Sequence, residues 1–94
     1  MITVNEYFDG KVKSMAINSG PLPATVGVML AGDYTFSTSK KEIMTIVQGE
    51  MTVKLPGESA SRTFRTGQVF EVPADASFDV SIPLDTAYLC QYCD

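Results

Sequence analysis

The chain has 94 residues, no histidine and a formal net charge of −4. Its length fits a single domain, residues 1–94, and leaves no room for a second. The negative charge argues against binding along a nucleic-acid backbone, which demands basic surface. The missing histidine removes the commonest metal ligand in proteins.

The N-terminal part of the sequence gives no sign of export or membrane insertion. Residues 1–6 lack the basic start and apolar core of a signal peptide, and no apolar run approaches the roughly 20 residues of a membrane helix. We therefore expect a cytoplasmic protein. The first predicted strand is 11–17, with Val12 on one face and Lys11 and Lys13 on the other. Residues 18–23 form a loop rich in glycine and proline.

The rest of the chain reads as short β-rich runs that end at turn residues, with almost no helical periodicity. Turn signals include Pro56-Gly57 and Pro73. The predicted strands are 26–30, 34–38, 43–47, 51–55, 62–65, 69–72, 78–82 and 87–92. Eight or more short antiparallel strands predict an all-β domain of the jelly-roll or small-barrel type.

Cys90 and Cys93 form a C-x-x-C pair at the end of the last predicted strand. Zinc normally requires four ligands, and a chain without histidine falls short of that number. A redox pair usually lies at the start of a helix, whereas strand positions three apart face opposite sides of the sheet. We expect reduced, partly buried cysteines.

Two stretches resemble the conserved motifs of cupins. Gly67, Pro73, Asp75 and Phe78 have the offsets of the second motif, with Asp75 at a turn-glycine position and Phe78 at the position of a metal-binding histidine. Glu42 and Gly49 have the spacing that closes the first motif, whose two histidines would fall near Phe36 and Thr38. The resemblance implies a single-domain cupin, a jelly-roll β-barrel, with Phe36, Thr38, Glu42 and Phe78 lining its cavity. One carboxylate among such neighbours makes a poor metal site, so we expect no metal and a pocket for an organic molecule.

A closer resemblance covers nearly the whole chain. The strings Asn5-Glu6-Tyr7-Phe8, Gly10-Lys11-Val12-Lys13-Ser14, Tyr34-Thr35-Phe36-Ser37-Thr38 and Tyr88-Leu89-Cys90 are similar to those of the small bacterial cupin-type pyrimidine/purine nucleoside phosphorylases. This resemblance implies phosphate-dependent cleavage of purine and pyrimidine nucleosides to a free base and a (deoxy)ribose 1-phosphate. It implies inorganic phosphate as co-substrate and no metal cofactor.

Such a reaction needs donors for phosphate. The candidates are Ser37 and Thr38, at the end of a predicted strand, and the basic residues Lys11, Lys13, Arg62 and Arg65. The alternative for the basic residues is a solvated surface position, and the alternative for the hydroxyls is hydrogen bonding within a turn.

The sugar and the base need different partners. Glu42 can accept bonds from ribose hydroxyls and stabilise developing positive charge, and Glu42 and Thr38 are the candidate catalytic residues. The alternative for Glu42 is an exposed strand position, in a solvated charge cluster with Lys40 and Lys41. Aromatic side chains can stack on any base or simply fill the core. The aromatic candidates are Phe36, Phe78, Tyr34, Tyr7 and Phe8.

Three other functions remain open at this stage. The first is a non-catalytic cupin that binds a small molecule as a sensor, because its pocket can have the same lining. A metal-dependent cupin enzyme is opposed by the missing histidines, and nothing in the sequence favours a purely structural module. A chain this short gains stability by pairing, so we expect a homodimer.

Overall fold

The computed structural model describes residues 1–93, and these residues form ten β-strands. The strands are β1 (Val4–Tyr7), β2 (Val12–Ile17), β3 (Ala24–Met29), β4 (Gly32–Ser37), β5 (Lys41–Gln48), β6 (Glu50–Lys54), β7 (Arg62–Arg65), β8 (Val69–Val72), β9 (Ser77–Ile82) and β10 (Thr86–Cys93). The predicted all-β class is confirmed, and each predicted strand has a counterpart. The sequence did not predict β1. Among the described residues no helix is present that can cross a membrane.

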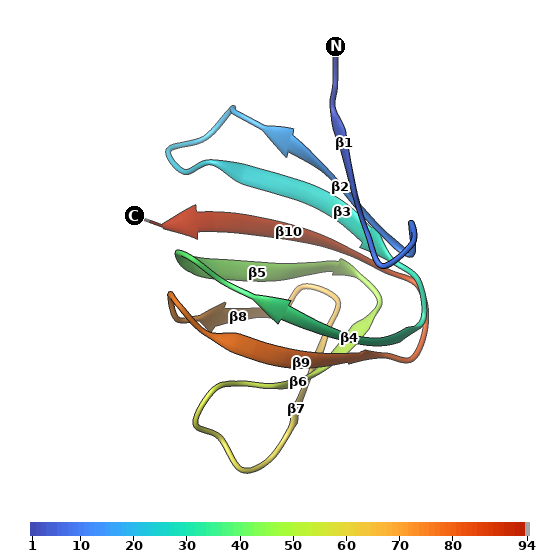
Figure 1. Cartoon of the computed structure of the whole chain (residues 1–94), viewed down its shortest axis with the longest axis vertical. Helices are drawn as coiled ribbons and strands as arrows, with labels where there is room; N and C mark the ends of the chain where they lie inside the picture. The colour runs from blue at the N-terminus through green and yellow to red at the C-terminus, as the bar shows by residue number, and fades with distance from the viewer. Residues whose placement is uncertain (94) are drawn as a thin grey trace.

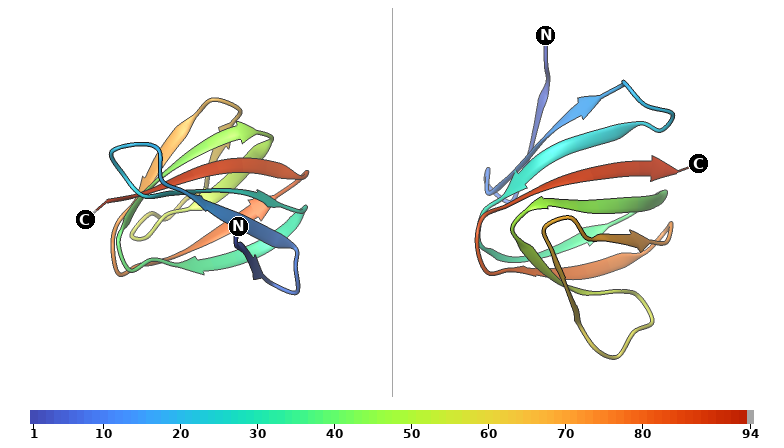
Figure 2. Two further views of the ribbon diagram at one scale, coloured as in Figure 1. Left: turned by 90° about the horizontal axis from the view of Figure 1, so that it is seen from above. Right: turned by 180° about the vertical axis from the view of Figure 1, so that it is seen from behind.

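The strands form two antiparallel sheets that face each other (Figures 1 and 2). The larger sheet has the order β1-β2-β3-β10-β5-β8, and the smaller one has the order β4-β9-β6-β7. The last strand, β10, lies in the middle of the larger sheet, between β3 and β5. The sheets therefore enclose a core to which both ends of the chain contribute.

The core follows from the alternation of side chains along each strand. In β9 and β8 every second residue is buried, and Val12, Ile46, Met51, Val53 and Val72 are fully buried between the sheets. These β-branched and unbranched apolar side chains give the interior its close packing.

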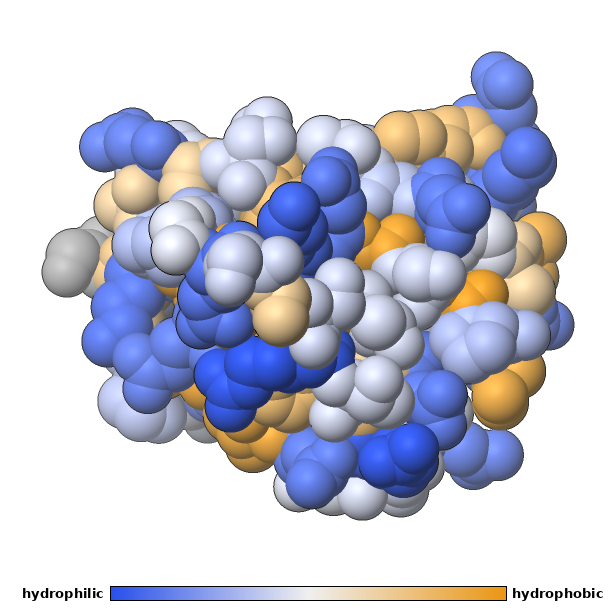
Figure 3. Space-filling model, turned by 90° about the horizontal axis from the view of Figure 1, so that it is seen from below, coloured by the Kyte–Doolittle hydropathy of each residue, from blue (hydrophilic) through white to orange (hydrophobic). Residues whose placement is uncertain are grey.

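The outer faces of the two sheets differ in polarity. On the smaller sheet, neighbouring outward positions run Asp33, Ser81, Thr52 and Thr63, all polar. Seen from below, hydrophilic and neutral residues predominate and the apolar areas are small and separate (Figure 3). On the larger sheet, one row of paired residues crosses all six strands: Val4, Met15, Val26, Leu89, Thr45 and Val69. Five of these six are apolar, so an apolar row crosses this outer face, which also carries the exposed ion pairs Lys13–Glu6 and Lys41–Glu71.

Two turns carry backbone conformations that the cupin offsets anticipated. Asp75 stands at the turn-glycine position and adopts φ +54°, a left-handed conformation that aspartate tolerates better than most residues. Gly49, between β5 and β6, has φ +123°. A Cβ there would meet the Cβ and Cα of Thr86 at 2.8 and 2.9 Å. The close approach of Thr86 therefore requires glycine at position 49.

Candidate functional site

A cavity of about 140 Å³ lies between the sheets. Its lining residues are Tyr7, Ser14, Met29, Phe36, Ser37, Glu42, Met44, Phe78, Tyr88, Cys90 and Tyr92. They come from β1, β2, β3, β5 and β10 on one side and from β4 and β9 on the other. Ser37 ends β4 and Glu42 lies near the start of β5, so the cavity occupies the end of the barrel between these two strands.

Glu42 supplies the one carboxylate among the lining residues. Its side chain is half-buried, and Oε1 accepts a hydrogen bond from Cys90 Sγ at 3.4 Å. Burial raises the pKa of Glu42, and the bond from Cys90 acts in the opposite direction. The cavity therefore places a carboxylate in a less polar setting than water, where its field on a nearby positive charge is strengthened.

The hydroxyl groups of the cavity come mainly from tyrosine and serine. Burial raises the pKa of Tyr88 to about 12, and burial also raises the pKa of Tyr92. Both phenols are therefore neutral near pH 7 and can donate hydrogen bonds. The Tyr92 hydroxyl lies 3.0 Å from the Thr25 hydroxyl, which fixes its ring against β3. Ser14 and Ser37 add two more hydroxyls to the lining.

An aromatic wall closes the opposite side of the cavity. Phe36 and Phe78 are paired across β4 and β9, with ring centroids 5.8 Å apart and planes at 30°. Phe8 covers Phe36 edge-on at 5.5 Å and contacts Tyr34 at 4.9 Å. Tyr34 is buried behind this wall, where its hydroxyl donates to the Leu30 carbonyl at 2.6 Å. Phe36 and Phe78 are thus two of the aromatic side chains that line the cavity, beside Tyr7, Tyr88 and Tyr92.

The structure brings together five of the residues singled out from the sequence. Glu42, Phe36, Phe78, Ser37 and Tyr7 all line the cavity.

Thr38 lies elsewhere, contrary to the expectation that it faces inward. Its buried hydroxyl donates to the Pro73 carbonyl at 2.7 Å and accepts from the Ala76 amide at 3.1 Å. Both bonds tie the end of β4 to the loop between β8 and β9, which contains Asp75. The hydroxyl is thereby engaged in the turn, as the alternative from the sequence described.

The basic candidates do not line the cavity either. Lys11 and Lys13 are exposed, and Lys13 Nζ pairs with Glu6 Oε1 at 3.2 Å. Arg62 and Arg65 lie on β7, where their guanidinium groups pair with Glu58 at 3.8 Å and Glu50 at 3.3 Å, respectively. No lysine or arginine occurs among the lining residues, so an anion inside the cavity must rely on hydroxyl and backbone donors.

Sequence reasoning missed Ser14, Met29, Met44, Tyr88, Cys90 and Tyr92 as lining residues. The alternation of residues along the predicted strands held a signal for four of these six residues. Tyr88, Cys90 and Tyr92 alternate along one strand, and Ser14 shares a strand face with Val12, opposite the lysines. Choosing the inner face required knowledge of which strands flank β10.

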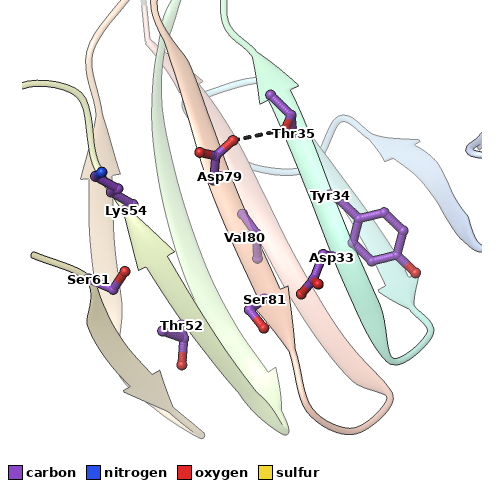
Figure 4. Close-up of a pocket in the computed structure, with 9 residues that line it drawn as sticks. All are labelled: Asp33, Tyr34, Thr35, Thr52, Lys54, Ser61, Asp79, Val80 and Ser81. Carbon is purple, nitrogen blue, oxygen red and sulfur yellow. Dashed lines mark hydrogen bonds between the residues drawn. The ribbon is translucent and has the colours of Figure 1, made fainter.

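A larger depression, of about 350 Å³, lies on the outer face of the smaller sheet (Figure 4). Its lining is mostly exposed and polar, and Asp79 accepts a hydrogen bond from Thr35 at 2.8 Å. Asp33 and Asp79 face a single lysine there, Lys54. The depression lacks an aromatic surface directed at a ligand and carries two carboxylates that repel phosphate, so the inner cavity is the better candidate site.

Comparison with known proteins shows the family of the chain. The model of the family described as pyrimidine/purine nucleoside phosphorylase matches residues 2–92. A protein of that name from Marinobacter nauticus is 60% identical over 92 residues, which cover 98% of this chain and 99% of the relative. A crystal structure of a Vibrio parahaemolyticus protein of unknown function superposes with a TM-score of 0.93 at 43% identity, covering 99% of both chains.

A cupin from Shewanella frigidimarina confirms the predicted fold. It superposes with a TM-score of 0.76, covering 97% of this chain and 82% of its own. At 17% identity the likeness concerns the fold alone.

Proposed function

Because the chain belongs to the pyrimidine/purine nucleoside phosphorylase family, we propose that it cleaves both purine and pyrimidine nucleosides with inorganic phosphate. A phosphate oxygen forms a bond to C1′ of the pentose while the bond from C1′ to the base nitrogen breaks. The base leaves with that electron pair and takes up a proton, and the pentose leaves as its 1-phosphate. The supporting observation is a cavity in which one carboxylate faces a pair of aromatic rings.

Glu42 is the proposed catalytic group. Positive charge develops on the sugar ring as the bond to the base breaks, and a carboxylate held in a partly buried site stabilises that charge. The same carboxylate can accept hydrogen bonds from ribose hydroxyls and orient the sugar. Burial of Glu42 in the cavity strengthens both effects, because fewer water molecules compete for it.

Phe36 and Phe78 are the proposed base-binding residues. Every nucleobase has a π-face, so stacking on these rings does not discriminate between purines and pyrimidines. A cavity of about 140 Å³ is smaller than the roughly 300–1,000 Å³ of common ligand pockets, so it encloses only part of a nucleoside. We place phosphate at the mouth, beside the exposed Ser37 hydroxyl at the end of β4.

The direct test is the release of base from inosine and from uridine, with and without phosphate. Release from both that depends on phosphate supports the proposal, and the rate should not change when a chelator is added. Within residues 1–93 no three His, Cys, Asp or Glu side chains come together to hold a metal ion. Release from neither nucleoside would favour the second candidate, a non-catalytic binding cupin, which the absence of Lys and Arg from the lining also favours.

We also propose that two chains pair through the outer face of the larger sheet. The apolar row from Val4 to Val69 crosses the whole sheet, and three of its members, Val4, Met15 and Val69, are 50%, 38% and 52% exposed. Contiguous exposed apolar surface of this kind usually marks an interface. A second copy is the fitting occupant because the row carries no charge, so identical faces can stack without like charges meeting.

A charge placed in this face should separate the proposed dimer. Val28→Lys is expected to sediment as a monomer at micromolar concentration, where the wild type sediments at twice the chain mass of 10.2 kDa. The matched control is Ser81→Lys, on the polar outer face of the smaller sheet, which should leave the mass unchanged. A monomeric wild type would contradict the proposal.

A further inference from the structure

The carboxylate of Glu42 has a specific partner, the thiol of Cys90. Cys90 lies on β10, on the same inner face as Tyr88 and Tyr92, and it is only 2% exposed. Its Sγ is 3.4 Å from Glu42 Oε1, within the range of a hydrogen bond to sulfur. Among residues 1–93, the Cys90 thiol is the group that donates a hydrogen bond to the Glu42 side chain.

The proton of this contact belongs to the thiol. Burial and the neighbouring Glu42 raise the pKa of Cys90 to about 12, so the thiol is neutral and can donate near pH 7. The other titratable groups that face Glu42 are Tyr7, Tyr88 and Tyr92, from β1 and β10. From β4 and β9 the cavity receives Phe36, Ser37 and Phe78, which do not titrate.

The strand register gives this contact a direction. Glu42 is paired with Tyr92, whereas Cys90 is paired with Met44, two residues further along β5. The thiol therefore meets the carboxylate from the deeper side of the cavity. A carboxylate held at one oxygen from below presents the other oxygen toward the mouth, where the sugar must lie.

We propose that Cys90 is a positioning residue that holds Glu42 Oε1 and directs Oε2 toward the ribose hydroxyls of a bound nucleoside. This inference rests on the proposed function for its consequence in catalysis. The contact itself does not depend on that function, so the two can be tested separately.

Removal of the thiol should change catalysis in a recognisable way. Cys90→Ala is expected to lower kcat about tenfold, with a smaller change in the KM for phosphate, because an ordered carboxylate acts mainly in the transition state. The thiol opposes the rise in the pKa of Glu42, so its loss should move the acid limb of the pH–rate profile to higher pH. Cys90→Ser retains a hydrogen-bond donor, so it should restore much of the wild-type kcat and return the acid limb toward its wild-type position.

Cys93→Ala is the matched control. Cys93 is the second cysteine of the chain, lies three residues further along β10 and is half-buried outside the cavity lining. It should keep the wild-type acid limb and kcat. If Cys90→Ala folds poorly, Cys90→Val takes its place in the comparison, because valine fills the volume of the cysteine side chain but has no hydrogen-bond donor.

A titration of the substrate-free protein tests the contact without any assay of activity. The carboxyl carbon of Glu42, followed by NMR in protein labelled at glutamate, should report a higher pKa in Cys90→Ala than in wild type and in Cys93→Ala. An unchanged pKa, or an acid limb that does not move in an active variant, overturns the inference. If wild type releases no base, the proposed function fails, and the NMR comparison still decides whether Cys90 holds Glu42.

Discussion

Glu42→Gln should lower kcat by roughly a hundredfold or more while leaving the fold intact. The amide has almost the same shape and can still accept a bond from Cys90, but it carries no negative charge to set against the positive charge of the transition state. Steady-state rates with inosine and with uridine measure the loss. Both nucleosides should be affected alike, because the carboxylate acts on the sugar and not on the base.

The same substitution should not lower stability at neutral pH. Burial raises the folded-state pKa of Glu42 above its value in the unfolded chain, so ionisation is easier in the unfolded state. Unfolding therefore releases protons, and the contribution of this group to stability falls as the pH rises through these pKa values. Glutamine removes that penalty, so urea unfolding at pH 7 should show wild-type stability or better.

Glu58→Gln is the matched control for activity. Glu58 lies in the turn after β6, with its side chain 39% exposed and 3.8 Å from Arg62. An exposed ion pair of this kind contributes little to stability, and Glu58 is remote from the cavity lining. Its variant should retain wild-type rates. Equal activity in the two variants would remove Glu42 from the mechanism.

Gly49→Ala should cost about 3 kcal/mol of unfolding free energy, the sum of backbone strain and overpacking. Residue 49 has φ +123°, which side-chain-bearing residues rarely adopt, and the new methyl group would collide with Thr86. Thr86 is fully buried and cannot retreat, because its hydroxyl accepts from the Glu50 amide at 3.1 Å and donates to the Leu84 carbonyl at 2.9 Å. Urea denaturation followed by circular dichroism measures the loss.

Gly20→Ala is the control for this effect. Gly20 lies in the loop between β2 and β3, and a Cβ there meets nothing within 4 Å. Its variant should remain within about 0.5 kcal/mol of wild type. If both alanine variants unfold at the same urea concentration, the close approach of Thr86 does not restrict position 49 to glycine.

Most strands were predictable because their apolar residues alternate and because turn residues separate them. The exception was β1, whose four residues, Val4–Tyr7, mix one apolar, two polar and one aromatic side chain. Its existence depends on pairing with β2, a tertiary contact that no local pattern records. The left-handed turn at Asp75 was accessible from the spacing to Pro73 and Phe78, since such a position tolerates few residue types.

The cavity was only partly predictable. Glu42, Phe36 and Phe78 were found through the cupin offsets, because those offsets fix which positions point inward. Thr38 has the correct offset, but it comes directly after the end of β4, where its hydroxyl is used by the next turn. The basic candidates were chosen for their charge, and charge alone does not reveal that Lys13 faces Glu6 and solvent.

The reaction itself was accessible only through resemblance to a family. The cavity lining offers a carboxylate, hydroxyl groups and aromatic rings, but the same lining would serve a binding protein. Cys90 illustrates the limit most clearly. Its spacing from Cys93 drew attention to redox and zinc chemistry, whereas its position in the fold makes it a neighbour of Glu42.

Gly27 has a consequence for redesign of the cavity. It lies on β3 between Ser14 and Tyr88, and a Cβ on it would meet the Lys13 carbonyl oxygen and the Tyr88 ring and hydroxyl, each at 2.6 Å. The phenol therefore occupies the volume that a side chain at position 27 would fill. A smaller residue at position 88 opens space against bare backbone, whereas position 27 must remain glycine, because the Lys13 carbonyl oxygen would still lie 2.6 Å from a Cβ there. The capacity of the site for ligands of different size can thus be tuned from its back wall, with Glu42, Phe36 and Phe78 left in place.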